Sequence, residues 1–495
     1  MELNKPRLFR VAGITLLLMV ALMFPSLCFA LYENDQSMVR AFGYPMAFSL
    51  LIGIPILLFV KKDSFFIKIR DGYMTIFLII AITCSLGAVP YQIGIDNANF
   101  AESIFESVAG FTTTSATVFS EPSMPHSLLL WKSIEHWAGG LIILMLVISI
   151  LPVMGVGDFQ IATVESHSGF MNKIAPKYMY IIKYIVAIYM SITVLALIYF
   201  LFAKIGVYDA VILALTTTST AGVMIHTGGI SYYDSFYIEL GVTLFTLISA
   251  INYVIYIHLL KKNFNEIKKN SEFKVFWYII AIGTLIIAFI LHFSTSDTTW
   301  LTSFRDSFFQ VTSFVTTSGF ALKDYTLWPQ SSTYILIMLM IIGGCSASTT
   351  GSIKIMRIMV MLKLIQRNFY KKMHPRAISA VKIGGTPISP KTCSSITAFC
   401  ITFAITLLVS TLLLTTQNID INTAFSAAIG TLSNNGISFG NIGMDGSYAI
   451  FHPILLIFLS MLMLIGRLGF FTIVMVFLPS FWNPTKTSSM SRRIK

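Results

Sequence analysis

The chain has 495 residues, of which 55% belong to the hydrophobic set and only 11% are charged. Soluble proteins carry about 25% charged residues, so this composition excludes a soluble enzyme, a disordered chain and a small disulfide-stabilised secreted domain. The formal net charge of +12 would suit a nucleic-acid partner, but the positions of the basic residues argue against one.

Ten stretches are long and apolar enough to be membrane spans, because a spanning helix needs about 20 predominantly apolar residues. They lie at 8–31, 42–60, 73–93, 127–154, 178–203, 235–260, 275–293, 333–365 (interrupted), 394–416 and 449–480. The first also fits a cleaved signal peptide, since Lys5, Arg7 and Arg10 precede an apolar stretch that ends at Cys28, Phe29 and Ala30. Its length and the span that follows it favour a helical hairpin. The sequence therefore predicts an all-α polytopic membrane protein.

The basic residues between the spans set the orientation, because Lys and Arg concentrate on the cytoplasmic side. Of the 34 Lys and Arg residues, 26 fall in six segments that share one side if the N-terminus is inside. These segments are 1–10, 61–72, 155–183, 261–274, 363–391 and 483–495. We therefore expect both termini in the cytoplasm, membrane lipid around the spans and no nucleic-acid partner. The short loops favour the inner membrane of a bacterium.

Four connections on the opposite side repeat one pattern. They run roughly at 96–126, 205–234, 296–331 and 418–448. Each holds an apolar piece too short to span, followed by a cluster of Thr, Ser, Asn and Gly. Aligning the clusters on Ser115, Gly222, Gly319 and Gly436 gives intervals of 107, 97 and 117 residues. We call these four residues the filter positions.

The residue 13 positions before each filter position is a hydrogen-bond acceptor. These residues are Glu102, Asp209, Asp306 and Thr423. We expect each to cap the N-terminus of a short pore helix. The predicted organisation is an N-terminal hairpin at 1–60, pore repeats at 73–154, 178–260, 275–365 and 391–480, and a cytoplasmic tail at 481–495. All four repeats face the same way, unlike those of inverted-repeat transporters.

The repeated segments carry groups suited to a cation. Each short helix would point its C-terminal end, which has partial negative charge, into the membrane. The strand after it offers carbonyl oxygens, and such backbone at membrane depth must line a cavity or be buried in protein. Four strands around one axis can replace the hydration shell of a monovalent cation. No catalytic or nucleotide-binding constellation is visible in the sequence, so we expect a pore and not an enzyme.

Several motifs resemble those of the Trk/Ktr/HKT superfamily of potassium transporters, bacterial Trk type. The stretch GFTTTSATV at 110–118 is similar to the first pore loop of that family, and the other three clusters are similar to its other loops. Further matches are HWAGG at 136–140, LPVMGVG at 151–157, GGC at 343–345 through GSIK at 351–354, HPRA at 374–377 and GRL at 466–468. The resemblance covers nearly the whole chain.

The resemblance implies potassium uptake, a homodimer and a cytosolic nucleotide-binding regulatory subunit. The potassium ion is the cargo, and no cofactor or other metal is expected in this chain. The ion would be held by the two residues before each filter position. These are Thr113, Thr114, Thr220, Ala221, Thr317, Ser318, Asn434 and Asn435.

Two positions depart from the family pattern. The family usually has Gly where this chain has Ser115, which keeps a sodium-permeable or weakly selective cation channel as the alternative. It usually has Glu where this chain has Gly469, so no salt bridge from that position is expected. Passive conduction and proton- or sodium-coupled symport both stay open. A polytopic membrane enzyme or receptor is a more distant alternative, because the ionisable residues are isolated.

The span at 333–365 is interrupted by ten small or polar residues at 343–352. Such residues are poor helix formers, and unwound backbone here must face a cavity. A close helix crossing through small residues is the alternative. The position after the third cluster and the resemblance favour an unwound gate below the filter. Its residues are Gly343, Gly344, Ser346, Thr349, Thr350 and Gly351, with Arg467 opposite.

Arg467 lies 18 residues into the apolar run 449–480. An Arg inside a membrane is costly and is by default a functional candidate, although one near the cytoplasmic end can extend to the interface. We expect Arg467 to face the conduction path as an electrostatic barrier. Lys132 and Glu135 are three residues apart on one predicted helix, and we expect them to form a structural ion pair.

Overall fold

The computed structural model describes residues 4–60, 69–149, 178–294, 299–377, 379–443 and 446–482. The motif at 151–157, most of the basic segments at 61–72 and 155–183, and the tail at 483–495 lie outside these ranges. The sheet in the described part is a hairpin of β1 (Lys382–Ile383) and β2 (Thr386–Pro387), antiparallel with Lys382 opposite Pro387. The other regular elements are helices, so the prediction of an all-α polytopic membrane protein is confirmed.

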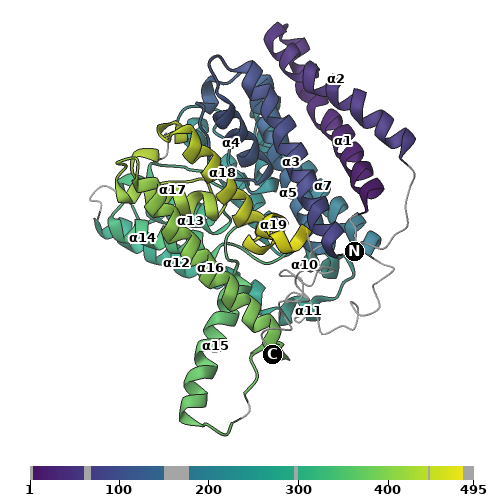
Figure 1. Cartoon of the computed structure of the whole chain (residues 1–495). Coiled ribbons are helices and arrows are strands. Elements are labelled where there is room, and N and C mark those ends of the chain that lie inside the picture. The colour runs from purple at the N-terminus through teal and green to yellow at the C-terminus, as the bar shows by residue number, and fades with distance from the viewer. Residues whose placement is uncertain are drawn as a thin grey trace.

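The first two helices, α1 (Lys5–Tyr32) and α2 (Gln36–Phe59), lie side by side at the edge of the molecule (Figure 1). Asp35 caps the N-terminus of α2, because its side chain accepts hydrogen bonds from the main-chain nitrogens of Ser37 and Met38. Many large apolar side chains on this pair are exposed, as expected for a surface in lipid.

The remaining helices follow in four successive sets. The first contains α3 (Ile69–Gly94), α4 (Phe100–Phe111) and α5 (His126–Ser149). The second contains α7 (Tyr178–Phe202), α8 (Val207–Ser219), α9 (Phe236–Ala250) and α10 (Tyr253–Leu260), and α11 (Phe264–Lys269) leads to the third. The third contains α12 (Ser271–Ser294), α13 (Trp300–Val315), α14 (Gln330–Ile342) and α15 (Ile355–Met373). The fourth contains α16 (Pro390–Thr415), α17 (Ile421–Leu432), α18 (Pro453–Leu468), α19 (Phe470–Phe477) and α20 (Pro479–Trp482).

Each set contains a helix of 12 to 16 residues that follows its long first helix, and we call these helices, α4, α8, α13 and α17, the pore helices. Short 3-10 turns lie between each pore helix and the following helix. They are η1 (Glu121–Ser123), η2 (Gly229–Tyr233), η3 (Tyr325–Leu327), and both η4 (Gly440–Ile442) and η5 (Tyr448–Ile450).

Seven described helices are long and apolar enough to cross a membrane, and α9 with α10 makes an eighth if the bent pair is one span. The continuous helix expected over 235–260 is wrong, because the chain bends by 88° between α9 and α10. Asn252 starts the new helix by accepting a hydrogen bond of 2.9 Å from the main-chain nitrogen of Val254. The continuous helix over 449–480 is also wrong, because Gly469 has φ +84° and ends α18.

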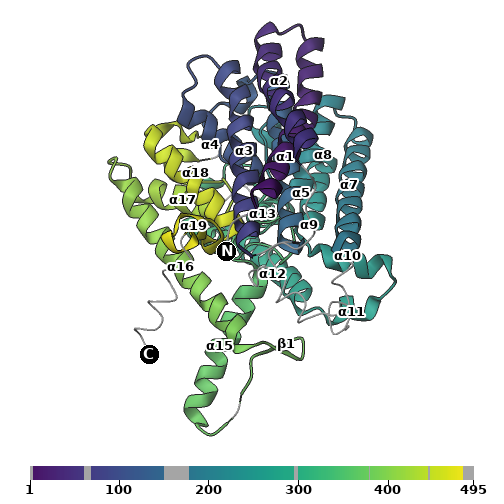
Figure 2. The same cartoon turned by 45° about the vertical axis from the view of Figure 1, so that its right-hand side comes forward.

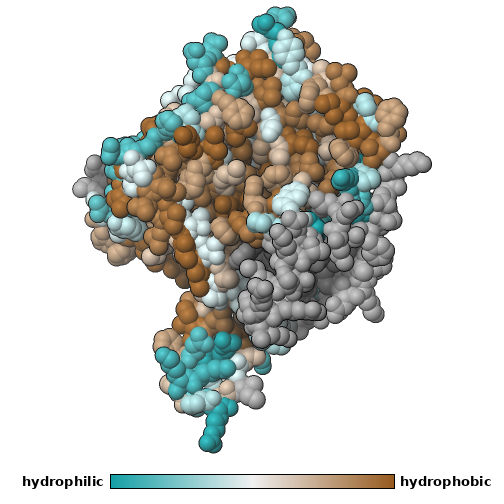
Figure 3. Space-filling model, in the orientation of Figure 1, coloured by the Kyte–Doolittle hydropathy of each residue, from teal (hydrophilic) through white to brown (hydrophobic). Residues whose placement is uncertain are grey.

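An apolar surface covers most of the body, with polar patches at opposite ends of it (Figure 3). Helix α15 projects away from the body at one of those ends, and the β1–β2 hairpin lies beside it (Figure 2). The pore helices lie inside the body, where most of their side chains are buried.

Candidate functional site

The four pore helices end in the same way. The residue two positions before each filter position has a left-handed backbone, which is uncommon for a residue other than Gly. The φ values are 53° at Thr113, 51° at Thr220, 51° at Thr317 and 55° at Asn434. The next residue in each case donates its main-chain N–H to the oxygen five positions back, at 2.9–3.0 Å, as in a Schellman motif. Four strands therefore leave four helices with matched geometry.

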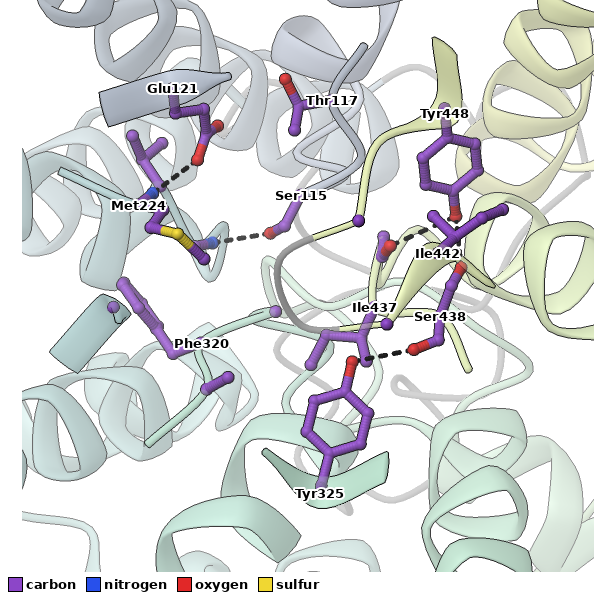
Figure 4. Close-up of a pocket in the computed structure, with 18 of the residues that line it drawn as sticks. Ser115, Thr117, Glu121, Met224, Phe320, Tyr325, Ile437, Ser438, Ile442 and Tyr448 are labelled. Carbon is purple, nitrogen blue, oxygen red and sulfur yellow. Dashed lines mark hydrogen bonds between the residues drawn. The ribbon is translucent and has the colours of Figure 1, made fainter. Parts of the chain in front are cut away.

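These strands bring all four filter positions together. Ser115, Gly222, Gly319 and Gly436 line one cavity of about 80 Å³. Figure 4 shows Ser115, Phe320, Tyr325, Ile437 and Tyr448 among the residues that line it. The eight residues expected to hold the ion are at most 1% exposed. The sequence therefore identified a group of residues that converge in space.

Ser115 contacts the strands of the other three segments. Its Oγ accepts a hydrogen bond of 2.7 Å from the nitrogen of Gly222 and donates one of 2.9 Å to the oxygen of Ser318. Its own nitrogen donates to the oxygen of Asn435 at 3.3 Å. Gly319 has φ +72° and a Cβ there would meet the Ser115 side chain, so the strands approach too closely for a second side chain.

The expectation that each acceptor 13 positions before the filter caps its pore helix is wrong for Asp209, Asp306 and Thr423, whereas Glu102 does take part in the cap of α4. The caps of α4, α13 and α17 are Asn99, Thr299 and Asp420, while Gly206 precedes α8 without a side-chain cap. The residue that precedes each pore helix lies three positions before the acceptor, and seven positions before it in α13, so the acceptor side chains are available for other contacts. At Asp420, hydrogen bonding from Thr423 lowers the pKa of the carboxyl group.

Three of these acceptors form a hydrogen bond or an ion pair with a residue in the segment that follows the filter position. Asp209 accepts from the His226 ring at 2.8 Å, and Asp306 pairs with Lys323 at 2.6 Å. Thr423 Oγ1 accepts from the nitrogen of Asn441 at 3.0 Å. Each contact therefore joins a pore helix to its own return segment.

In the first set, Glu106 makes the contacts with the segment after the filter position. Glu102 instead completes a capping box with Asn99. Glu106 accepts from the Thr117 hydroxyl at 2.9 Å and from the nitrogen of Val118 at 3.0 Å. The sequence alignment selected Glu102 because it considered one fixed spacing, whereas the first set uses the next turn of the helix.

Lys132 lies between two carboxylates, Glu106 and Glu121. Its Nζ is 2.6 Å from Glu121 Oε1, and the other Glu121 oxygen accepts from the nitrogen of Met224 at 2.6 Å (Figure 4). Lys132 is fully buried, and the cluster carries a net charge of −1 when all three groups are ionised. Because Glu121 lines the cavity, this cluster places negative charge beside the filter positions.

The predicted Lys132–Glu135 ion pair is wrong. Glu135 instead accepts hydrogen bonds from the Tyr91 hydroxyl at 2.6 Å and the Ser107 hydroxyl at 3.0 Å. Gly87 and Gly110 leave room for the carboxylate between α3 and α4, since a Cβ at either position would meet its oxygens. Packing of the neighbouring helices therefore outweighs the attraction of two charges on one helix.

The chain is unwound between α14 and α15, as the small residues at 343–352 predicted, and every residue of that stretch is buried. The last four carbonyls of α14 would lack partners in lipid. They accept from the nitrogens of Gly343, Ile353 and Lys354 and from the Ser352 hydroxyl. The loop thus supplies hydrogen-bond donors to the end of its own helix, so the carbonyl groups there have partners at membrane depth. We call residues 343–352 the intramembrane loop.

The intramembrane loop contacts the strands that carry the filter positions. Thr220 Oγ1 donates to Thr349 Oγ1 at 3.1 Å, and the nitrogen of Gly351 donates to Thr317 Oγ1 at 2.9 Å. A Cβ at Gly351 would meet the main-chain oxygen of Ser433. The loop therefore lies directly against the second, third and fourth strands, on the side where the pore helices end.

The break between α9 and α10 packs against the same loop. The oxygen of Ala250 accepts from the nitrogen of Cys345 at 3.2 Å, and the nitrogen of Tyr253 donates to the oxygen of Ala347 at 3.0 Å. Sequence reasoning missed this break, although Asn252 within an apolar run was a signal for it. Two interrupted helices thus satisfy each other's backbone groups.

Arg467 is the penultimate residue of α18 and is 8% exposed. It lines a second cavity with mostly apolar residues of α3, α5 and the end of α4, among them Phe111 and Thr112. Because Thr112 follows the last residue of α4, the guanidinium group lies near a helix C-terminus, where partial negative charge favours a cation. Within the described ranges its nitrogens have no hydrogen-bond partner. That Arg467 faces the conduction path stays a prediction.

Comparison with known proteins agrees with this architecture. A family model for TrkH, described as a cation transport protein, matches residues 44–483. The Trk system potassium uptake protein TrkH of Salmonella typhimurium is 29% identical, over 96% of this chain and 98% of the relative. TrkG of Escherichia coli K12, also named a Trk system potassium uptake protein, is 27% identical over 93% of this chain and 95% of its own.

A crystal structure of the potassium transporter TrkH from Vibrio parahaemolyticus superposes with a TM-score of 0.87 and 27% identity. The match covers 97% of this chain and 100% of that one. These relatives are named as transporters, in agreement with the expectation that the chain is not an enzyme. With a family match over most of its length, the chain belongs to the TrkH family of cation transport proteins.

Proposed function

We propose that this chain takes up potassium ions across the membrane. The observation that carries the proposal is the convergence of four matched strands on one cavity lined by Ser115, Gly222, Gly319 and Gly436. Carbonyl oxygens of these strands replace the hydration shell of the ion, and the residues before each filter position hold it. The C-terminal ends of four pore helices add partial negative charge. Each helix set serves as one pore repeat, behind the N-terminal hairpin.

The intramembrane loop serves as the gate in this proposal. Its contacts with Thr220, Thr317 and Ser433 support that role, because they bring the loop against three of the four strands. An ion that leaves the filter must pass the loop or displace it. Arg467 adds an electrostatic barrier to cations from α18.

A sodium-permeable or weakly selective channel is the second candidate, and Ser115 favours it. Its hydroxyl engages the nitrogen of Gly222 and the oxygen of Ser318, a group that a potassium filter would turn toward the ion. A competing hydrogen bond reduces the field that this oxygen offers to a cation.

We further propose a homodimer that binds a cytosolic nucleotide-binding subunit, in a bacterial inner membrane with both termini in the cytoplasm. Support comes from α15, which projects from the body (Figure 1). Leu362, Ile365 and Phe369 follow one face of it at helical spacing and are 49–65% exposed. An apolar stripe on a projecting helix fits a protein partner.

Ion flux into liposomes that contain the purified protein tests the proposal. Opposed gradients of potassium, rubidium, sodium and lithium should give fastest flux for potassium and rubidium. Equal rates for all four ions would favour the weakly selective channel, and no flux above protein-free liposomes would contradict transport altogether. The reversal potential at different proton and sodium gradients separates passive conduction from symport.

Gly319→Ser and Gly43→Ser form a matched pair of variants for the same assay. A side chain at Gly319 meets Ser115, whereas one at Gly43 in α2 has nothing within 4 Å. Only the first variant should change the potassium-to-sodium ratio.

A further inference from the structure

A buried carboxylate contacts the intramembrane loop. Glu272 is the second residue of α12 and only 1% exposed. Its Oε1 accepts a hydrogen bond of 2.6 Å from the main-chain nitrogen of Ser346, 74 positions away. Burying a carboxylate without a strong donor is costly, so this position demands a specific partner. A charge-assisted hydrogen bond is roughly twice as strong as a neutral one.

The other contacts of the loop show what Glu272 adds. The Ser352 hydroxyl at the end of the loop donates to a carbonyl of α14, and Thr349 and Gly351 form hydrogen bonds with the filter strands. Cys345 and Ala347 bond to neutral backbone groups at the α9–α10 break. Ser346, in contrast, bonds to a carboxylate. It anchors the middle of the loop from the side of α12.

Resting on the gate proposed above, we propose that Glu272 is a positioning residue that holds the intramembrane loop against the filter strands through Ser346. When this hydrogen bond is made, the loop stays under the strands and ion flux is low. When it breaks, the middle of the loop loses its charged anchor and moves away more often.

The position of Glu272 also links the loop to the segment that precedes α12. Asn270 caps α12 by accepting a hydrogen bond of 2.8 Å from the nitrogen of Phe273. Helix α11 lies directly before this cap, and none of its residues is buried. Only Asn270 and Ser271 separate the end of α11 from the carboxylate that contacts the loop.

The test compares Glu272→Ala, Glu272→Gln and the matched control Glu266→Ala on exposed α11, each reconstituted in liposomes. Glu272→Ala should raise basal potassium flux about tenfold, which corresponds to about 1.4 kcal/mol in the loop equilibrium. Glu272→Gln keeps an oxygen acceptor but no charge, so flux should rise about threefold. This rise corresponds to roughly half the free energy expected for Glu272→Ala. Glu266→Ala should match the wild type. The potassium-to-sodium ratio should stay the same in all of them, because the filter strands are unchanged.

Cys345 supplies a second readout within the loop. It is fully buried in the structure. In a background where Cys28, Cys84, Cys393 and Cys400 are replaced by Ala, a water-soluble maleimide should modify Cys345 faster when Glu272 is Ala or Gln. A carboxylate that only stabilises the fold would lower flux and inserted protein without selectively exposing this thiol.

The outcomes separate this inference from the gate itself. Wild-type flux and wild-type Cys345 labelling in an inserted Glu272→Ala protein would overturn the role of Glu272. If shortening the loop within 346–350 still raises flux, the gate stands without it, and if shortening has no effect, the gate proposal fails. If Glu272→Ala does not insert, the isosteric Glu272→Gln decides, and unchanged flux and labelling in that variant overturn the inference.

Discussion

The hydroxyl group of Ser115 donates a hydrogen bond of 2.9 Å to the main-chain oxygen of Ser318. The two residues belong to the first and third pore segments, 203 positions apart. Since the same hydroxyl accepts from the nitrogen of Gly222, one side chain joins three of the four strands. A single serine side chain therefore connects three of the four filter strands.

Replacing Ser115 by Gly should raise the preference for potassium over sodium without abolishing transport. The change removes one of two donors to the Ser318 oxygen, since the nitrogen of Gly222 also donates to it, and this increases the field that the oxygen can offer to a cation. A sixfold change in the permeability ratio needs only about 1 kcal/mol, well within the range of one hydrogen bond. Liposome flux ratios measure the effect. An unchanged ratio would show that position 115 does not set selectivity.

Replacing Lys132 by Met should destabilise the folded protein strongly. The variant leaves Glu106 and Glu121 buried without their counter-charge, and breaking a buried ion pair in this way costs about 3–5 kcal/mol. Thermal inactivation of the purified protein in detergent provides the measurement.

Lys323→Met is the matched control for Lys132→Met, because Lys323 also pairs with a carboxylate but its side chain is 55% exposed. An exposed pair contributes about 0–1 kcal/mol. Equal loss of stability in the two variants would argue that burial of the Lys132 cluster has no special importance.

Much of the fold could be predicted from the sequence, because spans, the fourfold pattern and the intramembrane loop all depend on local composition. The filter positions were found by the spacing of four clusters, and they do converge. Contacts between helices were harder to predict. The partners of Lys132 and Glu135 depend on space left by Gly87 and Gly110, and one chain without an alignment does not report which helices meet.

The two unpredicted helix breaks have the same explanation. Asn252 and Gly469 lie in apolar runs that meet the length criterion for one continuous span. What stabilises the first break is a partner 90 residues or more away, since Cys345 and Ala347 bond to its backbone. Hydropathy does not contain that information.

Replacing Arg467 by Ala, or deleting part of 346–350, should raise basal cation flux. Removal of a buried positive charge lowers the free-energy barrier to a cation. A barrier that is lower by about 1.4 kcal/mol gives a tenfold faster flux. The liposome assay at low potassium measures it. Arg467→Lys keeps the charge and should retain most of the barrier, so a rise in the Lys variant equal to that in the Ala variant would argue against an electrostatic role.

Charge reversal of Lys371 and Lys372 to Glu should weaken the binding of the proposed cytosolic subunit. Both residues lie in the last turn of α15, the helix that projects furthest from the body, and this turn is polar at the surface (Figure 3). Exposed ion pairs contribute up to about 1 kcal/mol each, so losing two attractions should lower the affinity about tenfold at low salt. Because salt screens exposed charges over about 8–10 Å, the difference from wild type should shrink as ionic strength rises.

Reversal of Lys268 and Lys269 on α11 serves as the control for a general loss of positive charge. Affinity measured by pull-down that responds to neither mutation nor salt would limit this basic surface to a role in membrane orientation.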